Sequence, residues 1–485
     1  MSSSAAVARV GGSRRILIIA SLAAFMAFLD MTIVNIAFPA LEHAFRAQQG
    51  SSISWVLNAY NIVFAALLLP AGQLADRYSR RKLFLLGLAL FTLASGCCAI
   101  SPTLAVLIGL RMIQAVGAAI LIPTGMALLL PAFAPGEQIK AIALLAAVSG
   151  VAFAAGPSVG GILIHTVGWQ GIFLINVPIG ILTLGMAARM IGEPQPQHGG
   201  SRFPDVQGAL LVLLGVGLLA LAIVQGNSWG WIDTRTLVSF LAAGCLIAVA
   251  IARARRHVAP AIELDLFRER SFAAANLAIF AFAIGLAAKL LCDVLFMTSV
   301  WHYSELKTGL AVSASPLVTA MLASGAARVA MRIGERVAAA LGGALYAGGC
   351  LWYVARMAAE PHYLTAYLPG TLLTGSGIAL ILPTLTSTAM LSVPLPRLAA
   401  GAGVNSMIRQ LGAVLGIALF VAVVGSPSPA DALGAFHHGW ALAAVASALA
   451  ALATAALLTN ATGRGRALAA QGSGARLRPL GVRRP

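Results

Sequence analysis

Charged residues are scarce in this sequence. They make up 10% of the 485 residues, whereas 59% are apolar and the mean hydropathy is +0.90. Soluble proteins contain about 25% charged residues, so this composition excludes an ordinary water-soluble domain. Apolar runs of about 17–25 residues, each long enough to cross a bilayer as a helix, recur along the chain, and alternating strand patterns are missing. The sequence therefore predicts an all-α polytopic protein in a lipid bilayer.

Motifs for catalysis and for ATP-driven work are also missing. None of the four lysines follows a glycine, which excludes a phosphate-binding loop of the GK-[ST] type. The eight histidines form no H-E-x-x-H motif. The five cysteines lie in apolar runs without a C-x-x-C pair, which is typical of packing residues. We therefore expect no enzyme activity, no cofactor and no metal site.

The net charge of +17 comes from basic residues that lie between the apolar runs. A nucleic-acid-binding protein instead gathers basic residues on one face, so no nucleic-acid partner is expected. If the N-terminus is cytoplasmic, 25 of the 32 lysines and arginines fall on the cytoplasmic side and only 4 outside. This bias follows the positive-inside rule and predicts a bacterial-type inner (plasma) membrane protein with both termini in the cytoplasm.

Fourteen membrane-spanning helices are predicted from the apolar runs and turn signals. They cover 16–40, 52–72, 83–101, 104–130, 138–164, 170–190, 206–225, 236–252, 272–300, 308–327, 337–355, 364–392, 398–424 and 437–459. The polar stretch EPQPQHGGSRF follows the sixth helix and separates two six-helix halves, as in transporters built from repeats. The expected parts are a cytoplasmic segment 1–15, an N-terminal bundle 16–190, a linker 191–205, two extra helices 206–252, a cytoplasmic loop 253–271, a C-terminal bundle 272–460 and a basic tail 461–485.

The stretch FLDMTIVNIAFP (28–39) places Asp30 inside the first predicted span. An ionised aspartate at a helix centre costs about 2.5–3.5 kcal/mol, and a neutral one costs less, so its charge can follow a transport cycle. Asp30 is therefore the leading candidate for a proton site. Thr32 and Asn35 are nearby polar groups on the same stretch, and Pro39 lies at its end. A structural aspartate bonded to a neighbouring helix is the alternative.

The stretch LIGLRMIQAVGAA (107–119) places Arg111 inside the fourth predicted span. A buried arginine usually faces a polar cavity or a carboxylate. The alternative is that the side chain snorkels to an interface, because it lies only about seven residues into the span.

Two further motifs concern the contacts between helices. In GQLADRYSRRKLFLL (72–86) a glycine lets two helices approach each other closely, and the aspartate can accept hydrogen bonds from backbone N–H groups at the start of the next helix. The arginines can pair with this aspartate or anchor the loop at the membrane surface. The residues concerned are Gly72, Asp76, Arg77, Arg80 and Arg81. In GVAFAAGPSVGGIL (150–163) small residues form a face for helix contact and a proline kinks the helix. These residues are Gly150, Gly156, Pro157, Gly160 and Gly161. Simple anchoring and generic packing are the respective alternatives.

Together these motifs resemble those of the major facilitator superfamily, in particular its fourteen-helix drug:proton antiporters. The resemblance implies two six-helix bundles plus two additional helices, proton coupling at Asp30 and Arg111, and a conformational latch in the loop at 72–86. The glycine motif of the fifth helix resembles the antiporter branches and favours export. A late stretch, GAGVNSMIRQLGAVLG (401–416), extends the resemblance and adds Asn405 and Arg409 as candidates for cavity or coupling.

Two features lie outside this resemblance. Lys289 and Asp293 are four residues apart and hence on one helix face, where a mutually neutralising pair is favoured. The alternative is that one of them lines the cavity and selects charged substrates or carries a second proton. The stretch RIGER (332–336) repeats the spacing of RYSRR (77–81), which is consistent with either a duplication or a chance match.

The sequence thus predicts a proton-coupled antiporter that exports small amphipathic organic compounds, such as drugs, antibiotics and dyes, by alternating access. The proton gradient is the expected energy source. A proton-coupled importer or facilitator of a metabolite is the alternative, and a non-transporting sensor or scaffold is a third reading. Small-molecule substrates and protons are the expected partners, and participation of a periplasmic adaptor is left open.

Overall fold

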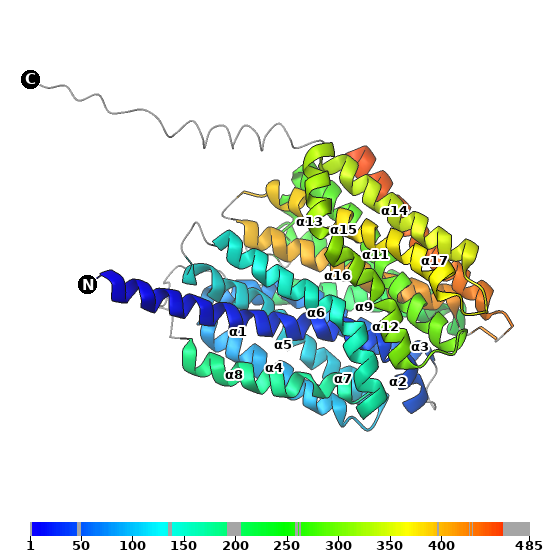
Figure 1. The fold of residues 1–485 in the computed structure, drawn as a ribbon, viewed down its shortest axis with the longest axis horizontal. Helices are drawn as coiled ribbons and strands as arrows, with labels where there is room; N and C mark the ends of the chain where they lie inside the picture. Colours follow the sequence, from blue (N-terminus) through cyan, green and yellow to red (C-terminus); the bar gives the residue numbers. More distant parts are fainter. Residues whose placement is uncertain are drawn as a thin grey trace, which may run out of the picture.

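The computed structural model describes residues 2–45, 50–133, 138–191, 205–257, 260, 263–394, 397–425, 427–428 and 430–458. All regular elements in these ranges are helices, and they run side by side through the molecule (Figure 1). The all-α fold class is confirmed. The predicted tail 461–485 and most of the predicted linker 191–205 lie outside the described residues.

The first eight helices pack with one another and form the N-terminal half. They are α1 (Ser2–Ile36), α2 (Phe38–Ala44), α3 (Gly50–Arg77), α4 (Arg80–Ala99), α5 (Leu104–Ala132), α6 (Gln138–Val167), α7 (Gly171–Leu174) and α8 (Asn176–Met190). Helix α5 packs against α3 and α4, and α1 packs against α6 and α5.

The last seven α-helices form the C-terminal half. They are α11 (Arg270–Ser299), α12 (Glu305–Val312), α13 (Ala314–Ile333), α14 (Glu335–Arg356), α15 (Leu368–Leu391), α16 (Leu398–Val424) and α17 (Ala432–Leu457), with a 3₁₀ turn η1 (Leu264–Arg268) and a π turn η2 (Tyr363–Tyr367). Here α11 packs against α16 and α17, and α14 packs against α15 and α17.

Helices α9 (Val206–Trp229) and α10 (Thr234–Ala254) form a separate hairpin. Helix α9 lies against α3 of the first half and α16 of the second, whereas α10 packs mainly on α9. Asp205 accepts a hydrogen bond from the Gly208 N–H at 2.8 Å and pairs with Arg253 Nε of α10 at 2.7 Å. This ion pair joins the start of α9 to the end of α10.

Thirteen described segments are long and apolar enough to cross a membrane. Helix α3 contains a shorter apolar stretch, Ile53–Leu68, but its 28 residues make the whole helix about 42 Å long, enough to span the bilayer. The chain is therefore an integral membrane protein.

Proline explains where predicted spans are interrupted. The first helix starts at Ser2 and ends at Ile36, not at 40, since Pro39 cannot continue it. Pro178, Pro316 and Pro369 follow the breaks between α7 and α8, α12 and α13, and η2 and α15. Each lacks the N–H that would bond four residues back, and its ring crowds that carbonyl.

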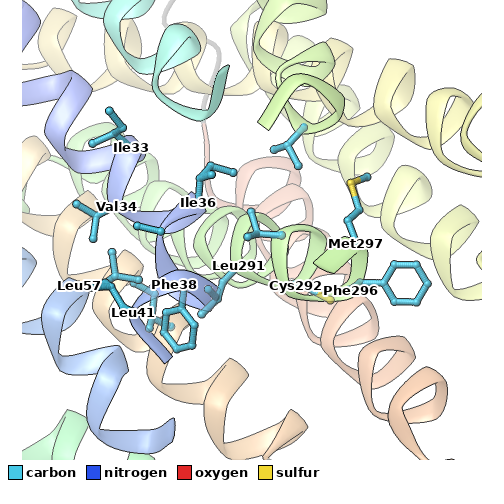
Figure 2. Close-up of a cluster of buried hydrophobic side chains, with 14 of the residues drawn as sticks. Ile33, Val34, Ile36, Phe38, Leu41, Leu57, Leu291, Cys292, Phe296 and Met297 are labelled. Atoms are coloured by element: carbon cyan, nitrogen blue, oxygen red, sulfur yellow. The ribbon is translucent and has the colours of Figure 1, made fainter. Parts of the chain in front are cut away.

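One apolar core joins the two halves at the end of the bundle that carries α2, α7 and α12; we call this the far end. Figure 2 shows Ile36 and Leu41 of the first half near Leu291 of α11. Of the other larger apolar clusters, three lie within one half each, and one joins α3 to α16 through α9. The structure is therefore the conformer in which the far end is sealed.

Candidate functional site

Asp30 lies on α1 and is completely buried, with 0% of its surface exposed. Its carboxylate Oδ2 accepts a hydrogen bond from Arg111 Nη1 of α5 at 2.5 Å. The other oxygen, Oδ1, accepts from Gln114 Nε2 at 2.9 Å and from Asn176 Nδ2 at 3.3 Å. Because all three neighbours donate, this is the hydrogen-bonding arrangement of an ionised carboxylate.

Arg111 is also buried, at 1% exposed, so it does not snorkel to an interface. Its Nε donates to the Val56 carbonyl oxygen of α3 at 3.3 Å, and its Cζ lies 4.1 Å from the centre of the Tyr60 ring. Nη1 also donates to Gln114 Oε1 at 2.7 Å. The guanidinium therefore ties α5 to α3 as well as to Asp30.

Neutral side chains complete what we call the Asp30 network: Asp30, Ser95, Arg111, Gln114 and Asn176. The Gln114 and Asn176 amides both donate to Ser95 Oγ of α4, at 3.1 and 3.0 Å, and Ser95 donates to the Phe173 carbonyl oxygen at 3.0 Å. The network thus links helices α1, α4, α5 and α8. Removing one partner of such a buried pair typically costs about 3–5 kcal/mol, because the other charge is left uncompensated.

Sequence reasoning did not identify the neutral members of the network. Gln114 could have been found, since it is three residues from Arg111 and therefore on the same helix face. Ser95 and Asn176 stand out only as polar residues inside apolar runs. Conversely, Thr32 and Asn35 do not contact the carboxylate: Thr32 Oγ1 donates to the Leu29 carbonyl oxygen and Asn35 Nδ2 to that of Met31.

The glycines of α6 lie at a seam between α1 and the second half. A Cβ placed on Gly156 would be 1.9 Å from Thr32 Oγ1, and one on Gly160 would be 2.9 Å from Ile33 Cγ1. A Cβ on Gly161 would be 2.7 Å from the Glu305 carbonyl oxygen of α12. By contrast, nothing lies within 4 Å of a Cβ on Gly150.

The α6 seam is reinforced from the other side. A Cβ on Gly309 of α12 would be 2.3 Å from the Pro157 carbonyl oxygen, and Ser158 Oγ shares a 2.5 Å hydrogen bond with Ser313 Oγ. Helix α6 is therefore in close contact with α1 on one face and with α12 of the other half on another.

The loop between α3 and α4 is held by its arginines and by a helix cap. Arg80 Nη1 donates to the Ala127 carbonyl oxygen at 3.2 Å, and Arg81 Nη2 to that of Ala188 at 2.7 Å. Ser79 accepts a hydrogen bond from the Lys82 N–H and caps α4. The side chains of Asp76 and Arg77 lie outside the described residues. A Cβ placed on Gly72 would be 3.6 Å from Pro123 Cβ, an ordinary van der Waals distance.

A second buried ion pair lies in the C-terminal half. Lys289 Nζ donates to Asp293 Oδ2 at 2.5 Å within α11. Asp293 also accepts from Tyr367 Oη at 2.8 Å and, at Oδ1, from Trp440 Nε1 at 2.8 Å. Asp30 and Asp293 thus occupy the first helix of their respective halves, and each has one cationic partner and two neutral donors.

The remaining candidates lie on α16. Asn405 Nδ2 donates to Asn276 Oδ1 of α11 at 3.1 Å, so this pair holds two helices of one half together. Arg409 is half-buried and forms no hydrogen bond or ion pair within the described part of the chain. Its neighbour Gln410 reaches Asn61 of α3 in the first half at 3.4 Å.

Two helical halves that share an apolar core at one end, each with a buried charge on its first helix, define a membrane transport protein of the two-bundle class. The profile described as Major Facilitator Superfamily matches residues 20–252. Together with the relatives below, this match shows that the chain belongs to the major facilitator superfamily. It is therefore a transporter and not an enzyme.

The relatives include exporters of antibiotics. The chain is 33% identical over 411 residues to "Multidrug resistance protein Stp" of Mycobacterium tuberculosis (strain CDC 1551 / Oshkosh), covering 84% of this chain and 75% of that protein. It is 32% identical over 447 residues to "Cephamycin export protein CmcT" of Amycolatopsis lactamdurans, covering 90% of each. The crystal structure of an auto inhibited POT family peptide transporter superimposes with a TM-score of 0.66 at 18% identity, covering 97% and 99% of the two chains. This last likeness shows the fold alone.

Proposed function

We propose that this protein exports small amphipathic organic compounds, such as drugs, antibiotics and dyes, in exchange for protons. The observation that carries the proposal is the Asp30 network, a fully buried carboxylate and guanidinium placed beside the α6 seam. The names of the relatives support export of antibiotics and drugs as the direction and cargo class.

A proton on Asp30 would change the forces between α1 and α5. Neutralising the carboxylate removes its attraction for Arg111, which keeps its contacts with Val56 and Tyr60 of α3. Since Asp30 is two residues from Thr32, which packs on Gly156, a small displacement of α1 reaches the seam within one helical turn. Protonation is thereby coupled to the contact between the halves.

The orientation gives this exchange its direction. With both termini in the cytoplasm of a bacterial-type inner membrane, the sealed far end faces outward. In this conformer Asp30 has the hydrogen bonds of the ionised form, as expected after a proton has been released to the cytoplasm. Cargo then enters from the cytoplasm, and renewed protonation from outside completes the alternating-access cycle.

Everted membrane vesicles test the proposal directly. With an acidic lumen, the wild type should accumulate ethidium, and adding ethidium should release luminal protons, reported by a pH-sensitive acridine dye. Asp30→Asn should abolish both signals at an unchanged amount of protein in the membrane. The matched control is Asp233→Asn at the N-cap of α10, where asparagine caps as well as aspartate.

The same experiment separates the alternatives. A proton-coupled importer would fail to load everted vesicles and would instead load right-side-out ones. A sensor or scaffold would load neither. Full ethidium exchange by Asp30→Asn would show that the carboxylate has a structural role only.

A further inference from the structure

A small cavity lies beside the second buried ion pair. Its lining comes from α11, α12, α13, α14 and α15 and is mostly apolar. Three polar residues interrupt this lining: Lys289, Ser315 and Tyr346. We call this space the Lys289 cavity.

The described lining of the Lys289 cavity exposes a positive charge but no negative charge to a ligand. Lys289 lines it, but Asp293 does not: Asp293 is 0% exposed and is surrounded by its three donors, Lys289, Tyr367 and Trp440. A molecule in the cavity would therefore meet the ammonium group and not the carboxylate.

Lys289 also has donor capacity left. An ammonium carries three N–H groups, and one bonds to Asp293. Nζ also lies over the ring faces of Tyr353 and Tyr367, whose centres are 5.1 and 5.8 Å away. Such faces hold a cation in place but accept weakly, so two N–H groups remain for a stronger acceptor.

Tyr346 gives an independent indication of a ligand. Its side chain is fully buried and lines the cavity, yet its hydroxyl has no hydrogen-bond partner among the described residues. A buried hydroxyl without a partner costs about 1–3 kcal/mol, so it is retained at a stability cost unless something bonds to it.

We propose that the Lys289 cavity is a headgroup subsite for cargo that carries a carboxylate. The inference rests on the proposed export function and specifies one class of its substrates. Lys289 donates charge-assisted hydrogen bonds to the acid, Tyr346 donates another, and the apolar lining takes the adjoining carbon atoms.

This subsite is connected to the contact between the halves. Val312 lines the cavity, and the next residue, Ser313, bonds to Ser158 of α6 at 2.5 Å. Cargo that displaces Val312 would therefore act on α12 at the α6 seam, on the side opposite to α1.

A matched pair of dyes tests the proposal. Tetramethylrhodamine carries a free carboxylate and its methyl ester does not, while the fluorophore is the same. The readout is the ratio of acid to ester accumulated by everted vesicles with an acidic lumen, with K⁺ and valinomycin clamping the membrane potential and vesicles without the protein as background. The wild type should accumulate both dyes, and Lys289→Met should lower the ratio at least tenfold, as expected for loss of a charge-assisted contact.

Two further variants guard against misfolding and against unspecific charge effects. Lys289→Met with Asp293→Asn removes both charges and leaves no unpaired ion, and it should lower the ratio as strongly as the single change. Lys307→Met removes an exposed lysine of α12 outside the cavity and should leave the ratio unchanged.

The outcomes are distinct. A wild-type ratio in the double variant would show that the pair is structural and would overturn the subsite. If the wild type accumulates the ester but not the acid, the subsite is refuted while export stands. If it accumulates neither dye nor ethidium, the proposed function itself fails.

Discussion

The α6 seam makes a quantitative prediction for Gly156→Ala. The new methyl carbon would be 1.9 Å from Thr32 Oγ1 and 2.8 Å from Thr32 Cβ. Ordinary contacts of this kind are about 3.5 Å, so α1 and α6 would have to separate by about 1.5 Å or rearrange locally. Overpacking of this kind costs about 1–3 kcal/mol, and the preference of helices for alanine returns at most about 1 kcal/mol.

The matched control is Gly150→Ala on the same helix. Its methyl carbon would meet nothing within 4 Å, so only the helix preference acts and stability should be unchanged or slightly raised. We expect the apparent melting temperature of the purified protein in detergent to fall for Gly156→Ala and not for Gly150→Ala. Ethidium accumulation should fall with it.

A compensating change separates this steric cause from a general loss of fold. Thr32→Ala removes Oγ1, whose hydrogen bonds are to carbonyls of its own helix. The double variant Gly156→Ala/Thr32→Ala should therefore recover part of the lost stability and transport, though not all, because the Cβ of residue 32 remains close. Equal behaviour of the two alanine variants, or no recovery in the double variant, would refute the reasoning.

Three further predictions concern single groups. Arg111→Lys keeps the charge but cannot bond to Asp30, Val56 and Gln114 together, so proton release on ethidium addition should drop at least tenfold with the protein still in the membrane. Burial alone would raise the pKa of Asp205, but the hydrogen bonds from the Arg253 side chain and the Gly208 N–H outweigh it and hold the pKa below its ordinary value. Its stabilisation is therefore complete above the unfolded pKa of about 3.9 and lost as the pH falls through the lower, folded pKa, so the melting-temperature gap between wild type and Asp205→Asn should persist from pH 7 to about pH 5 and close only as the pH falls below about 3.9. Ser79→Ala should cost about 1 kcal/mol and Ser79→Gly only a few tenths, measured by urea or thermal unfolding, and equal losses would contradict the capping role.

The charged pair in the N-terminal half was predictable because its residues break a rule. Asp30 and Arg111 stand in apolar runs where an unpaired charge is too costly, so each implies a partner. The sequence does not show that the two are partners of each other, because residues 81 positions apart meet only through the packing of α1 on α5. The neutral residues Ser95 and Asn176 could not be assigned to the site for the same reason, since a single polar residue in a membrane span does not indicate which residues it faces.

The positions where helices break could not be predicted from the sequence. Pro70, Pro123, Pro157 and Pro383 lie inside continuous helices, whereas Pro39, Pro178, Pro316 and Pro369 follow breaks. Neighbouring helices can hold a kinked helix together, and they decide which prolines end one. The number of spans therefore followed from hydropathy, while their internal breaks required the tertiary structure.

Helix α6 contacts both α1, which carries Asp30, and α12, which lines the Lys289 cavity. On one face, its Gly156 and Gly160 touch α1 within two turns of Asp30; on another, Gly161 and Ser158 touch α12 and the start of α13 beside the Lys289 cavity. Contacts this close leave no room for side chains to absorb a shift, so α1 and α12 cannot move independently of α6. If protonation and cargo act through α6, Gly161→Ala, whose methyl carbon would press on the α12 backbone, should uncouple them: the Asp30 network stays intact, but ethidium should no longer release protons. Unchanged proton release in this variant would place the coupling elsewhere than in α6.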